Sequence, residues 1–433
     1  MIRNRVLTLV GSIVAVALLS NVLSFTTQES RYSESYSAVV CPPITKGMLS
    51  YVSLTSPKIP VRITGTSAMN YKDARTRRFN GGVQAQVIDS TKVTPIAWVA
   101  QQGVWAGAIS CIAPVASQWF VGATADITSK GSLTLVNSGL GRALVKVNAF
   151  TESGAQAEQL IQIRANSITA INLATLAPGA NSLAIQVTPQ TGRVNAFLSD
   201  IRGRGLRALG GDMVNSQPEA GKDLVIPAIP QQTGKKSSMP HVLRILVPGE
   251  VSAHINATII STDGTFAPTG IDGKTIPAGR VFDLPIEALM KSGKFALKLT
   301  SDRPIVASVF SKTLSQGKAD FVWSTPVPPL EQTTMAVTGL APLFVFTGAK
   351  VSVGLDLTTT RGKVRHVEVN GEDIATYLVP DGIRAVTFSN VSKDTYAGAL
   401  IATKSGFGFA PVLTGSELTR SSIPHANIRV LIP

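Results

Sequence analysis

Short runs that alternate apolar and polar residues, separated by glycine- and proline-rich turns, are the feature that most constrains this chain. Examples are SLTLVN at 132–137, ALVKVNAF at 143–150 and QLIQIR at 159–164. A period of two places successive side chains on opposite faces of a strand, and turns that follow so closely leave no room for crossover helices. The expected fold class is therefore all-β, built from tandem antiparallel β-sandwich domains, immunoglobulin-like or related.

The composition excludes the main alternatives to a packed β protein. Of 433 residues, 44 % are hydrophobic and only 15 % are charged, so the chain can bury a core and is not a disordered polymer. Glutamate and lysine are too scarce for a coiled coil. The length predicts two to four domains.

The order of strands and turns recurs along the chain. We expect an N-terminal β region at 39–118, sandwich repeats at 119–213 and 214–330, and a third, diverged repeat at 331–433. Chance similarity between β-rich segments remains the alternative. In the first two repeats one set of residues should face the core, namely Leu133, Leu135, Val145, Val147, Leu243, Ile245, Ile255 and Ala257. The residues between them should point outward, namely Thr134, Lys146, Arg244 and Asn256.

The first 25 residues predict export. Arg3 and Arg5 precede an uncharged apolar run at 6–25, which is long enough to cross a bilayer of roughly 30 Å as a helix. Basic residues stay on the cytoplasmic side, so the rest of the chain is expected outside. We interpret 1–25 as a cytoplasmic stub and a single signal-anchor helix, with 26–38 as a polar tether. A cleaved signal peptide and a secreted product remain the alternative.

The only two cysteines, Cys41 and Cys111, agree with export. In an oxidising compartment they are expected to form a disulfide that closes a loop of about 70 residues. Two separate buried thiols are the alternative. A catalytic thiol is poorly supported, because no histidine occurs before His241.

A set of motifs runs along the chain: the N-terminal span, CPP at 41–43, Cys111 shortly before WFVG at 119–122, LxLVNSG at 133–139 and VxAFxSD at 194–200. Together they resemble a family of uncharacterised actinobacterial envelope proteins. The family carries a domain of unknown function and is encoded beside a family-two glycosyltransferase. The resemblance implies a membrane-tethered β protein of the cell envelope and supplies no catalytic residues.

Sequence motifs for catalysis are missing. The chain has no GxSxG, SxxK, HExxH or P-loop motif, and its four histidines are scattered, so we expect no catalytic, cofactor-binding or metal-binding residues and no cofactor. The glycine-rich stretch RGRGLRALGGD at 202–212 is interpreted as a basic linker, because no convincing helix follows it. An enzyme acting on wall polymer would need two facing carboxylates, which sequence spacing cannot identify.

Charge is the remaining functional signal. Forty Lys and Arg oppose 26 Asp and Glu, a net charge of +14. Outside a membrane, such a surface attracts lipid headgroups and wall polymers that carry phosphate or carboxylate, and nucleic acid is not expected as a partner. The candidate anion-binding residues are Lys72, Arg75, Arg77, Arg78, Arg202, Arg204, Arg207, Arg361, Lys363 and Arg365. A generally basic, solvated surface is the alternative explanation.

We therefore expect a non-enzymatic structural or recognition protein on the outer face of the bacterial cell membrane, in contact with anionic wall polymer or lipid. An accessory glycan-binding partner of an envelope glycosyltransferase is the alternative.

Overall fold

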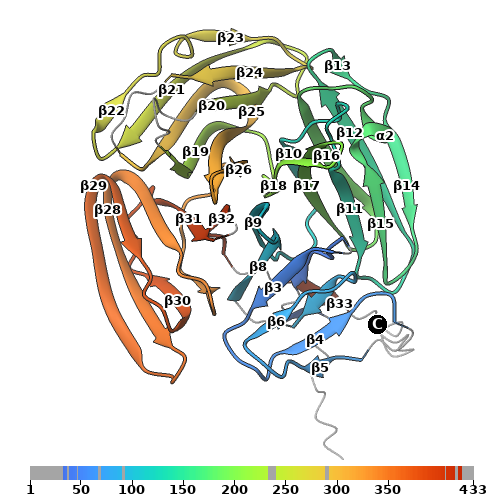
Figure 1. Ribbon diagram of the computed structural model, residues 1–433, viewed down its shortest axis with the longest axis vertical. Coiled ribbons are helices and arrows are strands. Elements are labelled where there is room, and N and C mark those ends of the chain that lie inside the picture. Colours follow the sequence, from blue (N-terminus) through green and yellow to red (C-terminus); the bar gives the residue numbers. More distant parts are fainter. Residues whose placement is uncertain are drawn as a thin grey trace, which may run out of the picture. The chain divides into compact units, whose positions relative to one another are not determined.

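The computed structural model describes residues 33–36, 39–45, 47–66, 70–89, 93–232, 240–287, 292–404, 406–414 and 418–421. Residues 37–418 form one compact unit, shown in Figure 1. In a small sheet of their own, β1 (Ser33–Tyr36) pairs with β33 (Leu418–Ser421). No helix in the described part of the chain has the length and apolar character needed to cross a membrane, and the run at 6–25 lies outside that part.

The chain is nearly all-β, and within 39–411 its named strands pair antiparallel with one exception, so the expected all-β class with antiparallel sheets is confirmed. The arrangement as tandem immunoglobulin-like sandwich domains stays a prediction. The strands fall into four successive groups, which we call the first to fourth lobes. The described residues contain a single short helix, α2 (Leu173–Leu176), in the second lobe. The domain limits expected from the sequence stay a prediction.

The first lobe contains two four-stranded arrangements, β2-β7-β4-β5 and β6-β3-β8-β9. Its strands are β2 (Val39–Cys41), β3 (Leu49–Ser53), β4 (Pro60–Ile63), β5 (Lys72–Asp73), β6 (Arg78–Asn80), β7 (Gln86–Ile88), β8 (Val93–Gln101) and β9 (Trp105–Ser110).

The second lobe packs the sheet β10-β16-β12-β13, extended by β14, against the sheet β15-β11-β17-β18 around one apolar core. Its strands are β10 (Gln118–Val121), β11 (Ser132–Asn137), β12 (Ala143–Thr151), β13 (Gly154–Ala155), β14 (Gln159–Ile163), β15 (Ser167–Asn172), β16 (Leu183–Thr191), β17 (Val194–Arg204) and β18 (Arg207–Val214).

The third lobe is organised around the 22-residue strand β25, whose two halves pair with different neighbours. Its strands are β19 (Gly221–Pro230), β20 (His241–Leu246), β21 (Ala253–Ser261), β22 (Gly264–Phe266), β23 (Lys274–Ile276), β24 (Val281–Ile286), β25 (Lys294–Ser315) and β26 (Lys318–Ser324).

The fourth lobe is built on a long hairpin of β28 and β29, and its strand β27 makes the one parallel pairing, with β8 of the first lobe. Its strands are β27 (Thr333–Ala336), β28 (Leu343–Thr359), β29 (Val364–Leu378), β30 (Ile383–Ser389), β31 (Tyr396–Thr403) and β32 (Gly406–Pro411). Trp98 of β8 and Phe344 of β28 consequently belong to one core cluster.

Four hairpins, β8–β9, β17–β18, β25–β26 and β31–β32, bring the lobes together (Figure 1). The amide of Asn215, just after β18, donates to the carbonyls of Ala108 at 3.0 Å and Phe409 at 2.8 Å. A Cβ on Gly408 would lie 2.6 Å from the backbone nitrogen of Ala108. Only glycine allows so close an approach between backbones, so the junction depends on it.

The predicted core face is confirmed in 119–213 and in 214–330, because all eight residues assigned to it are at most 1 % exposed. That these two segments are copies of one repeat stays a prediction. Alternation also holds for Asn256, which is exposed, and for Lys146, which is half-buried beside Glu158. The prediction for Arg244 is wrong, since this residue is 4 % exposed. Thr134 is half-buried and lines a small cavity with Trp105 of the first lobe. In both cases a neighbouring lobe covers the face that alternation alone assigns to solvent.

Candidate anion-binding site

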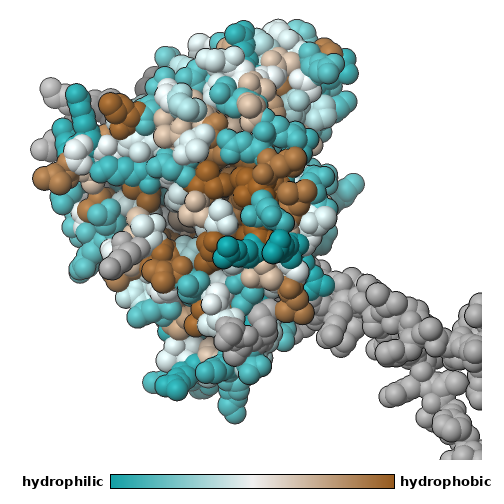
Figure 2. Space-filling model, turned by 90° about the vertical axis from the view of Figure 1, so that its right-hand side faces the viewer, coloured by the Kyte–Doolittle hydropathy of each residue, from teal (hydrophilic) through white to brown (hydrophobic). Residues whose placement is uncertain are grey.

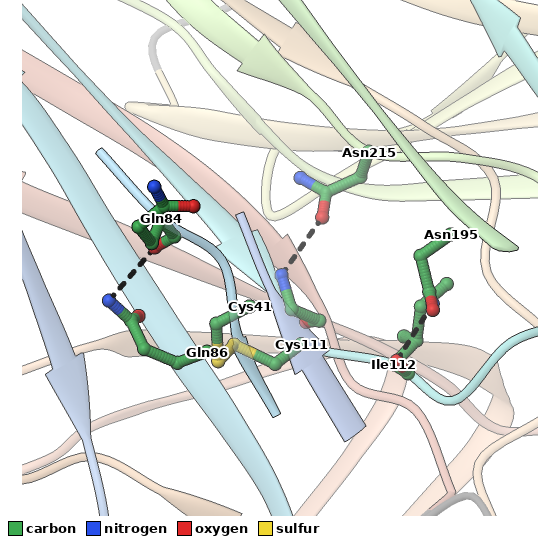
Figure 3. The surroundings of a disulfide bond; sticks show 8 residues. Cys41, Gln84, Gln86, Cys111, Ile112, Asn195 and Asn215 are labelled. Carbon is green, nitrogen blue, oxygen red and sulfur yellow. Dashed lines mark hydrogen bonds between the residues drawn. A yellow bond between two sulfur atoms is a disulfide. The ribbon is translucent and has the colours of Figure 1, made fainter. Parts of the chain in front are cut away.

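The predicted disulfide between Cys41 and Cys111 is present, with an S–S distance of 2.05 Å (Figure 3). Cys41 ends β2, and Cys111 directly follows β9. The residues on either side of Cys111 are held by the second lobe, because Asn215 accepts from the Ser110 amide at 3.2 Å and Asn195 donates to the Ile112 carbonyl at 2.9 Å. The disulfide therefore joins two segments of the first lobe, the end of β2 and the residue after β9, at the place where this lobe meets the second.

Three aspartates that the sequence analysis did not single out are buried where the hairpins meet. Asp212 accepts from the backbone of Trp323 at 2.6 Å, and Asp200 accepts from the indole of the same residue at 2.9 Å. Asp320 accepts from the Gly211 amide at 3.1 Å. Burial outweighs these amide contacts, so it raises the pKa of Asp320 to about 7 and the pKa of Asp212 well above its usual value. Asp200 and Asp212 end the motifs at 194–200 and 202–212, and the interpretation of 202–212 as a linker is wrong, because these residues belong to the β17–β18 hairpin.

Some of the predicted anion-binding residues serve the fold instead. Arg202 forms an ion pair with Asp200 at 2.7 Å and lies over the ring of Phe321. Arg78 lies over the ring of Tyr51 and donates to the Gly339 carbonyl at 3.2 Å. Guanidinium groups engaged in this way are less available to an external anion.

Other predicted residues are exposed but lie apart in the fold. Arg204 and Arg207 face each other across the β17–β18 turn, in the second lobe. Arg361, Lys363 and Arg365 lie at the turn and the start of β29, in the fourth lobe.

Lys72 of β5 and Arg75, two residues after this strand, do line a cavity, with a volume of about 550 Å³. We call it the Lys72 groove. Apolar side chains from β4 and β6, among them Ile63 and Phe79, form part of its wall together with both basic residues. Ile63 is 48 % exposed, so the groove presents apolar surface beside positive charge. Among the described residues that line it, Asp73 is the single acid.

A second, shallow and open depression of about 540 Å³ lies where the first lobe meets the second, and we call it the Arg164 groove. Thr66 lines both cavities, while Leu140 and Arg164 come from turns of the second lobe. The sequence analysis missed Arg164, because it is a single basic residue that becomes part of a cluster only through tertiary structure.

A buried arginine holds the two grooves in place. Arg62 donates to the side chain of Asn166 at 2.5 Å and to the Ser138 carbonyl at 2.8 Å. Asn166 in turn donates to the Thr66 carbonyl at 2.9 Å. The walls of both grooves are thus joined by hydrogen bonds that cross the boundary between the lobes.

The electrostatics favour anions at this place. Residues 39–118 contain eight Lys or Arg and only two Asp, with no Glu. Figure 2 views the molecule from the right-hand side of Figure 1 and shows apolar side chains gathered directly beside hydrophilic ones. Leu140, at the tip of the β11–β12 turn, is 79 % exposed. Apolar contacts beside positive charge suit a ligand with a carbon backbone and anionic groups.

Comparison with protein families identifies the family to which this chain belongs. No curated protein matches the sequence. The model of a family of unknown function, DUF5719, matches residues 81–375, which is more than half of the chain. The chain therefore belongs to the DUF5719 family.

Proposed function

We propose that this protein is a non-enzymatic recognition protein of the bacterial cell envelope, which binds phosphate- or carboxylate-bearing ligands in the Lys72 groove. In this proposal tandem β-sandwich repeats stand outside the membrane behind one N-terminal transmembrane helix at 6–25. The setting is an envelope of the actinobacterial type that the sequence resembles.

The Lys72 groove is the observation that supports this proposal most directly. Its volume lies within the range of about 300–1,000 Å³ that is typical of ligand pockets. Its wall carries Lys72 and Arg75 in the most basic part of the chain, and both residues are exposed. A dispersed basic surface would not combine charge with a cavity in this way.

The disulfide between Cys41 and Cys111 supports a location on the outer face of the membrane. Disulfides persist in oxidising compartments, which include the bacterial exterior.

A charge-reversal experiment tests the proposal. Full-length protein in neutral detergent is titrated with poly(glycerol phosphate), and the variant Lys72→Glu/Arg75→Glu should bind at least tenfold more weakly. The matched control is Arg361→Glu/Lys363→Glu, which reverses two exposed charges in the fourth lobe and should change affinity less than twofold. Equal weakening by both variants would show that the basic surface acts as a whole, and would refute a site in the groove.

A further inference from the structure

The two grooves share a wall, and this adjacency bears on the length of the ligand. Residues 63–66 run along both cavities, since Ile63 lines the Lys72 groove, Gly65 lines the Arg164 groove and Thr66 lines both. Three residues of extended chain cover at most about 11 Å, so the cavities are neighbours rather than distant sites.

The relative position of the two cavities is set by the fold. The Gly65 amide donates to the Asn166 carbonyl at 2.7 Å, and Arg62 ties Asn166 and Ser138 to the first lobe. Asn166 is 9 % exposed, so these contacts are shielded from water. A ligand that bridges both cavities would meet a surface that is already organised, which lowers the entropy cost of binding.

Each cavity repeats the same pairing of apolar surface and positive charge. The Lys72 groove combines Ile63 with Lys72 and Arg75, and the Arg164 groove combines Leu140 with Arg164. Arg164 is exposed and forms no ion pair with any described residue. A repeated pattern of this kind fits a polymer in which carbon units alternate with anionic groups, whereas a single headgroup would fill one cavity.

We infer that the Lys72 and Arg164 grooves form one track for a linear polyol- or sugar-phosphate polymer, with successive anionic groups at Lys72 and Arg75 in the first lobe and at Arg164 in the second. This inference rests on the proposed function of the Lys72 groove and adds the class and minimum extent of the ligand. When one polymer molecule occupies both cavities, its second contact is intramolecular. The affinity of the protein for the polymer therefore rises once the polymer is long enough to reach the second cavity.

Ligand length and a single substitution test the inference together. Full-length protein in neutral detergent is titrated with glycerol phosphate oligomers of two and of twelve units. The wild type should bind the twelve-unit oligomer at least tenfold more tightly. Arg164→Glu should weaken binding of the twelve-unit oligomer at least fivefold and change binding of the two-unit oligomer less than twofold.

The substitution is suited to this purpose because it leaves the fold contacts of residue 164 in place. The Arg164 carbonyl accepts from Asn137 at 3.0 Å and from Ser167 at 2.8 Å, and both bonds involve the backbone of residue 164. Arg303→Glu, on the exposed face of β25 in the third lobe, reverses the same charge and should leave both affinities unchanged.

The possible results separate the inference from the proposed function. If both oligomers bind with equal affinity, or if Arg164→Glu weakens both equally, the track is refuted and the Lys72 groove stands alone. If Arg303→Glu acts like Arg164→Glu, the effect is one of net charge, and the track is again refuted. If neither oligomer binds, the proposed function itself fails.

Discussion

Replacement of Arg244 by methionine would remove a buried cation that joins the second and third lobes. Its guanidinium donates to both carboxylate oxygens of Asp283, at 2.7 and 2.8 Å, and to the Ser182 hydroxyl at 3.1 Å. It also donates to the Ala123 carbonyl and lies 5.0 Å from the ring of Trp323. Asp283 and Arg244 belong to the third lobe, whereas Ser182 and Ala123 belong to the second.

The size of the effect follows from burial. Removing one partner of a buried ion pair costs about 3–5 kcal/mol, because the other charge is left uncompensated. The side chain of Arg244 is 5 % exposed and that of Asp283 is 34 % exposed, so water compensates part of the loss. We expect Arg244→Met to lower the free energy of unfolding by about 3 kcal/mol, at the lower end of that range.

The loss should also depend on pH. Burial raises the pKa of Asp283, but hydrogen bonds and charge from Arg244 outweigh it and bring that pKa below its ordinary value. A carboxyl whose pKa is lowered by folding stabilises the protein above its unfolded pKa, near 4, and this stabilisation is lost as pH falls through the folded pKa. The difference between wild type and Arg244→Met should therefore be largest at neutral pH and shrink near pH 3.

Denaturant unfolding at pH 7 and pH 3, with Arg303→Met as the exposed control, measures these quantities. The control should stay within about 0.5 kcal/mol of the wild type. The double variant Arg244→Met/Asp283→Asn should recover part of the loss, because it removes the unpaired carboxylate. A loss below about 1 kcal/mol, or one that is equal at both pH values, would show that the pair does not hold the lobes as described.

The remaining predictions concern the disulfide, the buried carboxylates, the core and the topology. Replacing Cys41 and Cys111 by serine should lower the free energy of unfolding, measured by denaturant titration, by about 4 kcal/mol, the chain-entropy value for a 70-residue loop. An unchanged denaturation midpoint would show that the disulfide does not stabilise the fold. Folding raises the pKa of Asp320 to about 7, so ionisation of this carboxyl lowers the free energy of unfolding as pH rises from about 4 to 7. Asp320→Asn should remove this loss of stability and raise the thermal midpoint at pH 8. Identical pH profiles of the thermal midpoint for variant and wild type would contradict the prediction. Leu135→Asp should unfold the second lobe, since an unpaired carboxylate at a fully buried position costs several kcal/mol, and retention of native circular dichroism would argue against the assigned core. Protease added to intact, wall-stripped cells should digest the chain beyond about residue 30, while protection of its bulk would reverse the orientation expected from the apolar run at 6–25.

The sequence by itself determined the local structure of this protein. Period-two alternation sets which residues of a strand share a face, so the pattern alone assigns Leu133 and Leu135 to the core, where both are fully buried. The disulfide could be predicted because the chain offers only two cysteines, Cys41 and Cys111. Both predictions depend on the residues themselves and on their immediate neighbours along the chain.

Tertiary structure alone decided what covers the second face of each sheet and which charges remain available to a ligand. Alternation assigns Arg244 and Thr134 outward, yet adjacent lobes pack there, so the arginine is buried and needs Asp283 as a partner. Basic residues that look equivalent in sequence also separate, since Arg202 is neutralised by Asp200 whereas Arg164 joins the groove beside Thr66. The physical reason is that contacts between lobes join residues far apart in sequence, from 62 positions for Arg244 and Ser182 to 194 positions for Asn215 and Phe409, and no local pattern encodes such pairings.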